Sequence, residues 1–415
     1  MKKTPKFIVV AGARPNFMKI APIMAAFANR DAARGQVVTK LVHTGQHYDR
    51  RMSDDFFSDL GIPDPDINLA VGSGSHAEQT ARVMIAFEQV CIEEKPDWVV
   101  VVGDVNSTLA CSVTARKLGI KVAHVEAGLR SRDMSMPEEI NRLCTDAVSD
   151  LLFTTDEIAV NNLRKEGVPD DRIDFVGNTM IDTLLRNLDK ALTLPLPAEL
   201  QERKYAVVTL HRPSNVDSAG ALRPLFNALQ KVAERVPVIF PVHPRTRSRL
   251  QEFGLLGADM NIHLIEPLSY LGFIGLVGRA CLVLTDSGGI QEETTVLRVP
   301  CLTMRNNTER PITCTLGTNT LVGTDPERIV AAAMDVLNYG VRESSVPPKW
   351  DGASGERIVD ALLAQVGIVR PAVDPLECSA SFASTEWREI ETIGASDGRR
   401  DQAFAVVDCE PAAAD

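Results

Sequence analysis

The sequence has few aromatic residues, and its cysteines show no spacing typical of a bridge or a metal site. Aromatic residues make up 5% of the 415 residues, and the eight cysteines include no CxxC pair. Scattered cysteines of this kind favour reduced thiols over disulfides or a zinc site. No run approaches the roughly 18 apolar residues that a transmembrane helix needs. We therefore expect a cytoplasmic protein that holds no metal and no cofactor.

The N-terminus is only superficially similar to a secretion signal. Basic residues precede an apolar stretch, but the stretch from Phe7 to Ala11 is short and is followed by Gly12 and Arg14. A signal peptide needs a longer apolar region. The segment instead predicts a buried first strand.

Positive charge is also in short supply, because the formal net charge is −11. Binding to nucleic acid or to an anionic membrane requires clustered Lys and Arg side chains. The charge balance therefore argues against both partners. It still allows a nucleotide-sized anion to bind in one local basic pocket.

Short apolar runs alternate with helical patterns through most of the chain, and its length favours two domains. Strands without polar alternation are typical of parallel sheets that are covered on both faces. The predicted strands are Phe7–Ala11, Val37–His43, Trp98–Val102, Val122–Val125, Leu151–Thr154, Ala206–Leu210, Pro237–Val242, Ile262–Ile265, Cys281–Thr285 and Cys301–Met304. The predicted helices are Asn16–Ala28, Ser107–Lys117, Glu138–Val148, Asp156–Glu166, Ala219–Glu234, Leu271–Val277, Gly289–Leu297 and Glu327–Leu337.

A proline-bearing segment, Leu192–Arg203, separates two strand–helix series and is typical of a linker. We predict the α/β class, with two Rossmann-like, doubly wound domains at residues 1–190 and 204–350 that face a cleft. Beyond about Val366 the chain is rich in Ala, Ser, Asp and Glu and has little periodicity. This composition predicts disorder for residues 368–415.

Ligands of open parallel sheets bind at the carboxyl ends of the strands, and the segment TDSGGIQEE is the best phosphate candidate there. Ser287, Gly288 and Gly289 lie where a strand passes into a helix, where backbone N–H groups and the helix dipole favour an anion. We place Glu292 and Glu293 in the first helical turn. For Glu292, stabilisation of the helix dipole and a functional role are equally good interpretations. Glu293 is placed to accept hydrogen bonds from ribose hydroxyls.

Two basic residues, Arg14 and Lys19, are five apart around the start of the first helix and can reach the same site. Lys19 fits a solvated helix end equally well. Neither GxGxxG nor GxxxxGK[ST] occurs at these turns, which weighs against dinucleotide and P-loop sites.

Acid and base side chains follow several of the predicted strands. Asp104 and Glu138 each have an alternative interpretation as helix-terminal residues, whereas Glu126 directly follows an apolar strand, where an unpaired carboxylate is costly to bury. His211 and His243 end two strands of the second half. Together these groups form a set suited to acid–base chemistry without a metal.

In these and other motifs the chain resembles the non-hydrolysing UDP-N-acetylglucosamine 2-epimerases, over roughly residues 6–367. The matching stretches are GARPNFMKIAP, HTGQHYD, GDVNSTLA, HVEAGLRSRDMSMPEEINR, VGNTMIDTL, TLHRPSN, PVHPRTR, LTDSGGIQEE and MRNNTERP. The resemblance implies a glycosyltransferase-B-like architecture in which a C-terminal helix, within residues 351–367, returns to the first domain. It also implies a homodimer, a role in polysaccharide biosynthesis, and reversible inversion at C2 that converts UDP-GlcNAc to UDP-ManNAc.

The resemblance carries roles over to individual residues. Asp104, Glu126, Glu138 and His211 occupy the catalytic positions of the family, and Arg142 lies close by on the helix that Glu138 opens. Which carboxylate removes the proton stays open. The positions that match contacts to the UDP moiety are Arg14, Lys19, His211, Phe273 through its backbone, Ser287, Gly288, Gly289, Glu293 and Arg310.

Some positions depart from the family pattern. Bacterial members use a Gln-His-Arg motif in a regulatory substrate site, whereas this chain has Gln46 and His47 followed by Tyr48. With Arg212 and His243, the first two residues form a candidate regulatory pocket. Leu268 stands where some members place a polar residue near the uracil.

Four alternatives remain open from the sequence. HTGQHYD, MPEEINR, TLHR and HPRTR also resemble epimerases of UDP-2,3-diacetamido-2,3-dideoxy-glucuronate, although TERP at 308–311 favours the GlcNAc enzyme. A hydrolysing 2-epimerase is disfavoured by HVEAGLR. A glycosyltransferase shares the fold but has less need of acid–base groups on both faces of one carbon. A catalytically silent nucleotide-binding module is disfavoured because all four acid–base positions are filled.

Overall fold

A computed structural model of the chain describes residues 4–34, 37–45, 60–196, 200, 204–257, 261–340 and 342–368, without the side chains of Arg14 and of residues 31–34. The part up to Ile368 forms one compact unit. The disorder prediction for residues 368–415 therefore falls almost entirely outside the described residues.

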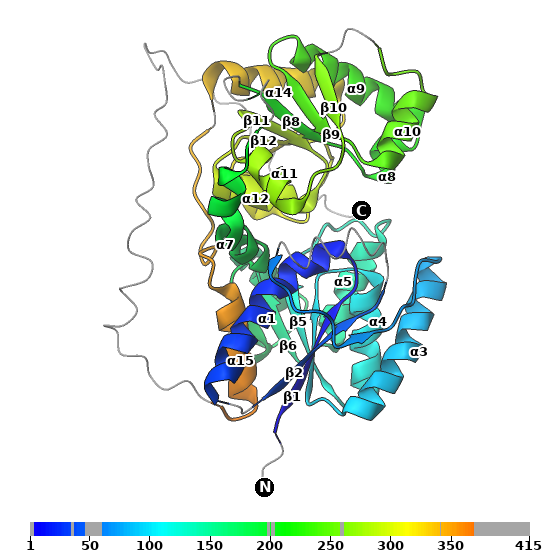
Figure 1. The fold of residues 1–415 in the computed structure, drawn as a ribbon, viewed down its shortest axis with the longest axis vertical. Coiled ribbons are helices and arrows are strands. Elements are labelled where there is room, and N and C mark those ends of the chain that lie inside the picture. The colour runs from blue at the N-terminus through cyan, green and yellow to red at the C-terminus, as the bar shows by residue number, and fades with distance from the viewer. Residues whose placement is uncertain are drawn as a thin grey trace, which may run out of the picture. The chain divides into compact units, whose positions relative to one another are not determined.

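The first half of the chain forms a seven-stranded sheet of parallel strands, in the order β3-β2-β1-β4-β5-β6-β7 (Figure 1). Its strands are β1 (Lys6–Ala11), β2 (Val38–His43), β3 (Ile67–Asn68), β4 (Trp98–Val102), β5 (Lys121–Ala127), β6 (Leu151–Thr154) and β7 (Ile173–Phe175). Its helices are α1 (Arg14–Arg34), α3 (His76–Glu94), α4 (Asn106–Lys117), α5 (Pro137–Val148), α6 (Glu157–Lys165), α7 (Thr179–Thr193) and α15 (Ser354–Gln365), with a 3₁₀ turn at Asp170–Arg172.

Both faces of this sheet are buried, which explains why its strands are mostly apolar. In β1, Phe7 and Val9 pack in a core with side chains of α1, α7 and α15. The intervening Ile8 and Val10 pack in a second core with side chains of α3 and α4. Successive strand side chains point to opposite faces, so a strand that is covered on both sides buries nearly all of its side chains.

The second half repeats this plan in a six-stranded parallel sheet, in the order β10-β9-β8-β11-β12-β13. Its strands are β8 (Ala206–Thr209), β9 (Val238–Pro241), β10 (Ile262–Ile265), β11 (Leu282–Thr285), β12 (Cys301–Thr303) and β13 (Asn319–Leu321). Its helices are α8 (Pro213–Val216), α9 (Ala219–Ala233), α10 (Pro244–Glu252), α11 (Tyr270–Val277), α12 (Gly288–Leu297), α13 (Pro311–Thr315) and α14 (Pro326–Tyr339). The two doubly wound parallel sheets confirm the predicted fold class.

Helices α7 and α15 connect parts of the molecule that are far apart in sequence. Helix α7 contacts α1 beside the first sheet and also α11 and α12 beside the second. Helix α15 packs against α1 and α7, as Figure 1 shows. Within the ranges given above, no helix is long and apolar enough to cross a membrane.

Several local predictions differ from the structure. Helices α3, α7, α8, α10 and α13 and strands β3, β7 and β13 were not predicted, and the expected linker begins before α7 ends at Thr193. Glu126 lies inside β5 rather than after it, at a register shift between Val125 and Ala127. Glu292 and Glu293 lie in the second turn of α12, because that helix begins at Gly288.

The packing of α15 predicts a large loss of stability when its apolar face is truncated. Ile358 is fully buried on α15, whereas Ile85 on α3 has 72% of its surface exposed. We expect Ile358→Ala to lower the free energy of unfolding by about 2–5 kcal/mol, because a cavity is left. The matched control Ile85→Ala should change it by less than about 0.5 kcal/mol. Urea unfolding followed by circular dichroism measures both, and equal effects would contradict this packing.

Candidate functional site

The turn between β1 and α1 brings one predicted cation to the carboxyl end of the first sheet. Asn16 holds this turn, because its Oδ1 accepts from the N–H groups of Gly12 (3.1 Å) and Ala13 (2.9 Å). Its Nδ2 donates to the carbonyl of Val102 at the end of β4 (3.0 Å). One helical turn further on, the buried Lys19 ammonium forms an ion pair with Glu126. The side chain of Arg14 lies outside the described residues.

Glu126 is the most constrained of the predicted acid–base residues. Its φ of +72° is in the left-handed region, which a non-glycine residue adopts rarely. Its carboxylate is buried and binds Lys19, and Oε1 accepts from Nη2 of Arg310 at 2.9 Å. Burial would raise the pKa of Glu126, but the charges of Lys19 and Arg310 outweigh burial and hold the pKa below its ordinary value. Glu126 is therefore an ionised carboxylate shared between two cations.

Asp104 lies on the turn after β4 and is held by Arg142. Nη1 of Arg142 donates to Oδ2 of Asp104 at 2.5 Å, and the carboxylate remains partly exposed. Helix α4 takes Val105 as its N-terminal cap, so the alternative interpretation of Asp104 as a helix cap is wrong. Arg142 itself is fixed by Glu139, whose Oε2 accepts from Nε (2.9 Å) and Nη2 (2.6 Å).

Glu139 was not predicted from the sequence, which pointed to its neighbour Glu138. Both follow Pro137, but Glu139 is buried and also accepts from the N–H groups of Ser131 and Arg132, each at 2.9 Å. Glu138 is half-buried in the first turn of α5. Burial lowers the pKa of Arg212, a residue of the second half of the chain, and the negative charge of Glu138 opposes this lowering. Helical spacing separates the two roles, since adjacent residues point about 100° apart.

His211 is oriented by a buried aspartate for which the sequence predicted no role. Its Nδ1 lies 2.9 Å from Oδ1 of Asp286, and about half of its side chain is exposed. Asp286 also accepts from the backbone N–H of Arg212 at 2.9 Å and from Asn215. Burial would raise the pKa of Asp286, but His211 holds it below its ordinary value. An ionised Asp286 fixes Nδ1 as the donor, which directs Nε2 to act as acid or base.

The start of α12 accommodates Arg310 only because Gly288 has no side chain. A Cβ on Gly288 would lie 2.5 Å from Nη1 of Arg310 and 2.6 Å from Oε1 of Glu309. Nη1 of Arg310 binds Glu309 at 2.6 Å, and Nε lies 2.9 Å from Oε1 of Glu292. Ser287 occupies the N-cap position, but its side chain does not cap the helix. The guanidinium therefore lies directly against the proposed phosphate site at Ser287, Gly288 and Gly289.

The two adjacent glutamates of α12 are both buried and both resist ionisation. Burial raises the pKa of Glu292 to about 7, and the charge of Glu126 adds to this effect while Arg310 opposes it. Burial likewise raises the pKa of Glu293 to about 8, and its Oε1 accepts from the hydroxyl of Tyr270 at 3.1 Å. The alternative in which Glu292 only stabilises the first helical turn is wrong, because it lies in the second turn beside Arg310.

The remaining predicted residues have structural contacts of their own. Phe273 lies on α11, and its side chain packs between two apolar clusters while its N–H donates to the carbonyl of Ser269. His243 caps α10, where Nδ1 accepts from the N–H of Arg245 at 3.3 Å. Gln46 and His47 lie outside the described residues. The regulatory pocket therefore stays a prediction.

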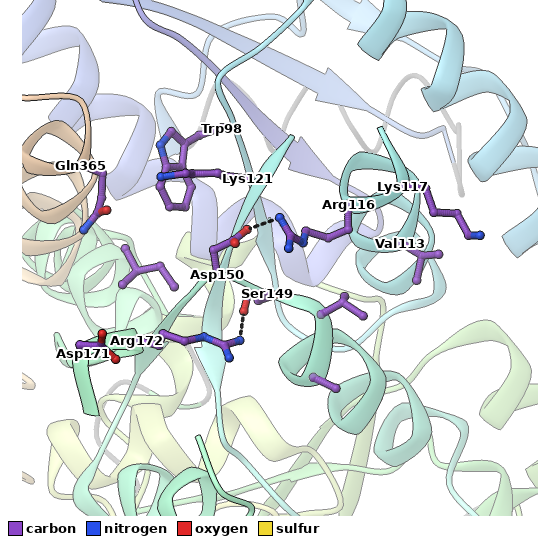
Figure 2. Close-up of a pocket in the computed structure, with 13 residues that line it drawn as sticks. Trp98, Val113, Arg116, Lys117, Lys121, Ser149, Asp150, Asp171, Arg172 and Gln365 are labelled. Atoms are coloured by element: carbon purple, nitrogen blue, oxygen red, sulfur yellow. Dashed lines mark hydrogen bonds and ion pairs between the residues drawn. The ribbon is translucent and has the colours of Figure 1, made fainter. Parts of the chain in front are cut away.

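A cavity of about 750 Å³ lies at the amino-terminal ends of β4, β5 and β6, at the edge of the sheet opposite to Glu126, and Figure 2 shows side chains that line it. Two of its cations have partners: Arg116 pairs with Asp150 at 3.0 Å, and Arg172 donates to the carbonyl of Ser149. None of the predicted site residues lines this cavity. Among the described residues, no group of three or more His, Cys, Asp or Glu side chains is arranged to hold a metal ion.

Comparison with known proteins gives consistent relatives. A family model described as UDP-N-acetylglucosamine 2-epimerase matches residues 30–363. The UDP-N-acetylglucosamine 2-epimerase of Methanocaldococcus jannaschii is 43% identical over 367 residues, which cover 86% of this chain and 98% of that protein. The UDP-2,3-diacetamido-2,3-dideoxy-D-glucuronate 2-epimerase of Pseudomonas aeruginosa is 41% identical over 342 residues, which cover 81% of this chain and 94% of that protein.

A solved structure agrees with these relatives. The crystal structure of the M. jannaschii UDP-GlcNAc 2-epimerase in complex with UDP-GlcNAc and UDP matches with a TM-score of 0.78 and 43% identity. The match covers 86% of this chain and 99% of that one. Similarity of this extent confirms the resemblance that the ordered sequence blocks predicted.

The raised pKa of Glu293 predicts how stability depends on pH in the absence of nucleotide. The folded protein keeps a proton on Glu293 up to about pH 8, whereas an unfolded glutamate loses it near pH 4.3. The free energy of unfolding should therefore fall as pH rises through this window, by on the order of 2 kcal/mol between about pH 6 and pH 9.

Glu293→Gln should abolish this part of the pH dependence, because glutamine can still accept from Tyr270 but cannot ionise. Denaturant unfolding at the two pH values measures the difference. Glu327→Gln on the exposed start of α14 serves as the matched control and should keep the full dependence. An unchanged slope for Glu293→Gln would show that Glu293 ionises normally.

Proposed function

We propose that this chain, which belongs to the UDP-N-acetylglucosamine 2-epimerase family, reversibly converts UDP-GlcNAc to UDP-ManNAc without a cofactor. One observation supports this chemistry most directly. Cations beside a candidate phosphate site bind directly to a buried carboxylate, since Arg310 lies against Gly288 and pairs with Glu126. Epimerisation through departure of UDP needs both groups within reach of one sugar.

The reaction requires UDP to leave before C2 can lose its proton. The C2–H bond beside an acetamido group is barely acidic, but oxocarbenium character at C1 acidifies it. The C1–O bond breaks with its electron pair going to UDP, a base takes the C2 proton, and 2-acetamidoglucal forms with a C1–C2 double bond. UDP then adds back to C1 while a proton reaches the opposite face of C2. The site must therefore retain UDP and supply acid–base groups on both faces.

In this proposal the half of the chain after residue 204 holds most of the nucleotide, and two residues of α1 complete the diphosphate site. The N–H groups of Ser287, Gly288 and Gly289 and the side chains of Arg14, Lys19 and Arg310 bind the diphosphate and stabilise its departing charge. Glu293 accepts the ribose hydroxyls, the backbone of Phe273 binds uracil, and the His211–Asp286 pair acts beside the leaving group. The half up to residue 190 supplies the acid–base carboxyl groups, and α15 completes it by packing on α1.

Binding of the diphosphate also activates Glu126 as the base. In the absence of ligand, Lys19 and Arg310 hold the pKa of Glu126 below its ordinary value. A diphosphate competes for the same two cations, and burial then dominates and raises the pKa. Asp104 and Glu138, which are more exposed, serve the opposite face of C2.

Incubation with UDP-GlcNAc in deuterated water, followed by NMR, tests the reaction. We expect deuterium at C2 of a product that still carries UDP. Release of free ManNAc would assign hydrolysis instead. The Pseudomonas relative makes UDP-2,3-diacetamido-2,3-dideoxy-glucuronate the second substrate to compare. If deuterium enters C2 of that sugar alone, it is the substrate in place of UDP-GlcNAc. If deuterium enters neither sugar, the proposed epimerisation is wrong.

Asp104→Asn should lower turnover by about 10²–10⁴-fold, because the amide cannot take or give the proton. UDP binding, measured by calorimetry, should stay within about threefold, because Arg142 keeps its second partner, Glu139. The control Asp170→Asn changes an exposed aspartate that forms an ion pair with Arg164 and should leave both values unchanged. Lost UDP affinity with retained turnover would contradict the role of Asp104.

We also propose that the protein is a homodimer in the cytoplasm. Light scattering of the full chain at micromolar concentration tests its assembly, and the mass of a monomer would contradict the proposed dimer.

A further inference from the structure

One buried histidine beside the site has no role in the chemistry described above. His124 lies in β5, two residues before Glu126, and is fully buried. Both of its ring nitrogens have close partners. Nε2 lies 2.8 Å from the carbonyl oxygen of Gly103, and Nδ1 lies 2.6 Å from Oδ1 of Asp146.

The partners determine how many protons the ring carries. A carbonyl oxygen can only accept, so Nε2 of His124 donates to Gly103. Asp146 accepts at Oδ2 from Nη2 of Arg130 (2.7 Å) and from the N–H of Gly128 (3.0 Å). Burial would raise the pKa of Asp146, but His124 and Arg130 outweigh burial and hold it below its ordinary value. An ionised carboxylate also only accepts, so Nδ1 donates as well.

We infer that His124 is held as an imidazolium and is a positioning residue, which fixes the Gly103–Asp104 turn and places a permanent positive charge beside Glu126. The protonation state follows from the two hydrogen bonds of the ring together with an ionised Asp146. The effect on catalysis rests on the proposed epimerisation.

The turn that carries Asp104 is held by β5 from two sides. The N–H of Gly103 donates to the carbonyl of Val125 at 3.0 Å, and its carbonyl accepts from His124. Gly103 has a φ of +67°, and a Cβ there would lie 2.8 Å from Nζ of Lys19. The turn therefore lies directly against the Lys19–Glu126 pair, and His124 anchors it there.

The charge of His124 differs from those of Lys19 and Arg310 because both ring nitrogens bind partners other than Glu126. Lys19 and Arg310 bind Glu126 directly, Arg310 also lies against Gly288, and the proposed function has both cations bind the diphosphate. His124 is enclosed, and its counter-charge is Asp146 on α5, which also binds Arg130, itself paired with Glu166. When a diphosphate competes for Lys19 and Arg310, the charge of His124 stays and limits how far the pKa of Glu126 rises.

NMR of the full chain labelled with ¹⁵N-histidine tests the protonation state. We expect both ring nitrogens of His124 to show the chemical shift of protonated nitrogen at about pH 8 to 9, where an ordinary histidine is neutral. His124→Gln assigns the signals, and in Asp146→Asn the ring should become neutral within this range. An unprotonated Nδ1 in the unaltered protein would overturn the inference whatever the enzyme's activity.

The pH profile of kcat tests the role in catalysis. His124→Gln keeps one amide donor but removes the positive charge. The acidic limb of the kcat profile reports the pKa of the base in the enzyme–substrate complex. Because the charge no longer lowers this pKa, the limb should move to higher pH by about one unit. His263→Gln on β10 is the matched control and should leave the limb in place. UDP binding within about threefold of normal shows that the variant is folded.

An unmoved acidic limb in folded His124→Gln would overturn the charge effect on Glu126. If His124→Gln does not fold, the same profile is measured on Asp146→Asn, and an unmoved limb in that variant would overturn the effect equally. If neither sugar incorporates deuterium, the proposed function is wrong, but the ¹⁵N measurement of the protonation state of His124 remains valid.

Discussion

The site depends on one buried carboxylate that is shared by two cations from distant parts of the chain. Glu126 is held by Lys19 from the first helix and by Arg310 from the loop before α13. A buried ion needs close partners of opposite charge to offset its desolvation, so this cluster fixes the groups around it. Gly103 and Gly288 pack against the cluster at positions where a Cβ has no room. Removing either cation would leave a buried charge without full compensation.

The same burial sorts the carboxyl groups into different protonation states. Glu126, Asp286 and Asp146 face cations or donors and stay ionised, whereas Glu292 and Glu293 are buried with fewer compensating charges and keep a proton near neutral pH. A site that must take a proton from one face of a carbon and give one to the other needs such a range. A diphosphate that competes for Lys19 and Arg310 would change this distribution, so binding and proton transfer are linked.

The sequence predicted the strands apart from β3, β7 and β13, because most buried parallel strands are apolar, and it pointed to the edge of the candidate site, because ligands bind at the carboxyl ends of such strands. It could not place Glu126 inside β5, since a register shift gives no signal in composition. It selected Glu138 and missed Glu139, because only packing shows which neighbour faces Arg142. The His211–Asp286 pair was missed because it depends on sheet order: β8 and β11 are neighbours in space, although their last residues are 76 positions apart in the chain. Helix α3 was missed because exposed Ile85 and Ile92 obscure its amphipathic pattern.

The state of Glu126 is the central claim, and a titration of its carboxyl carbon by ¹³C NMR tests it most directly. Glu126→Gln identifies the signal in protein labelled with ¹³C-glutamate. Without ligand, the carboxyl should titrate with a midpoint below that of an ordinary glutamate, and saturating UDP should move this midpoint upward. A midpoint near neutral pH without ligand, or one that UDP leaves unmoved, would contradict a carboxylate held by two cations that the diphosphate also binds.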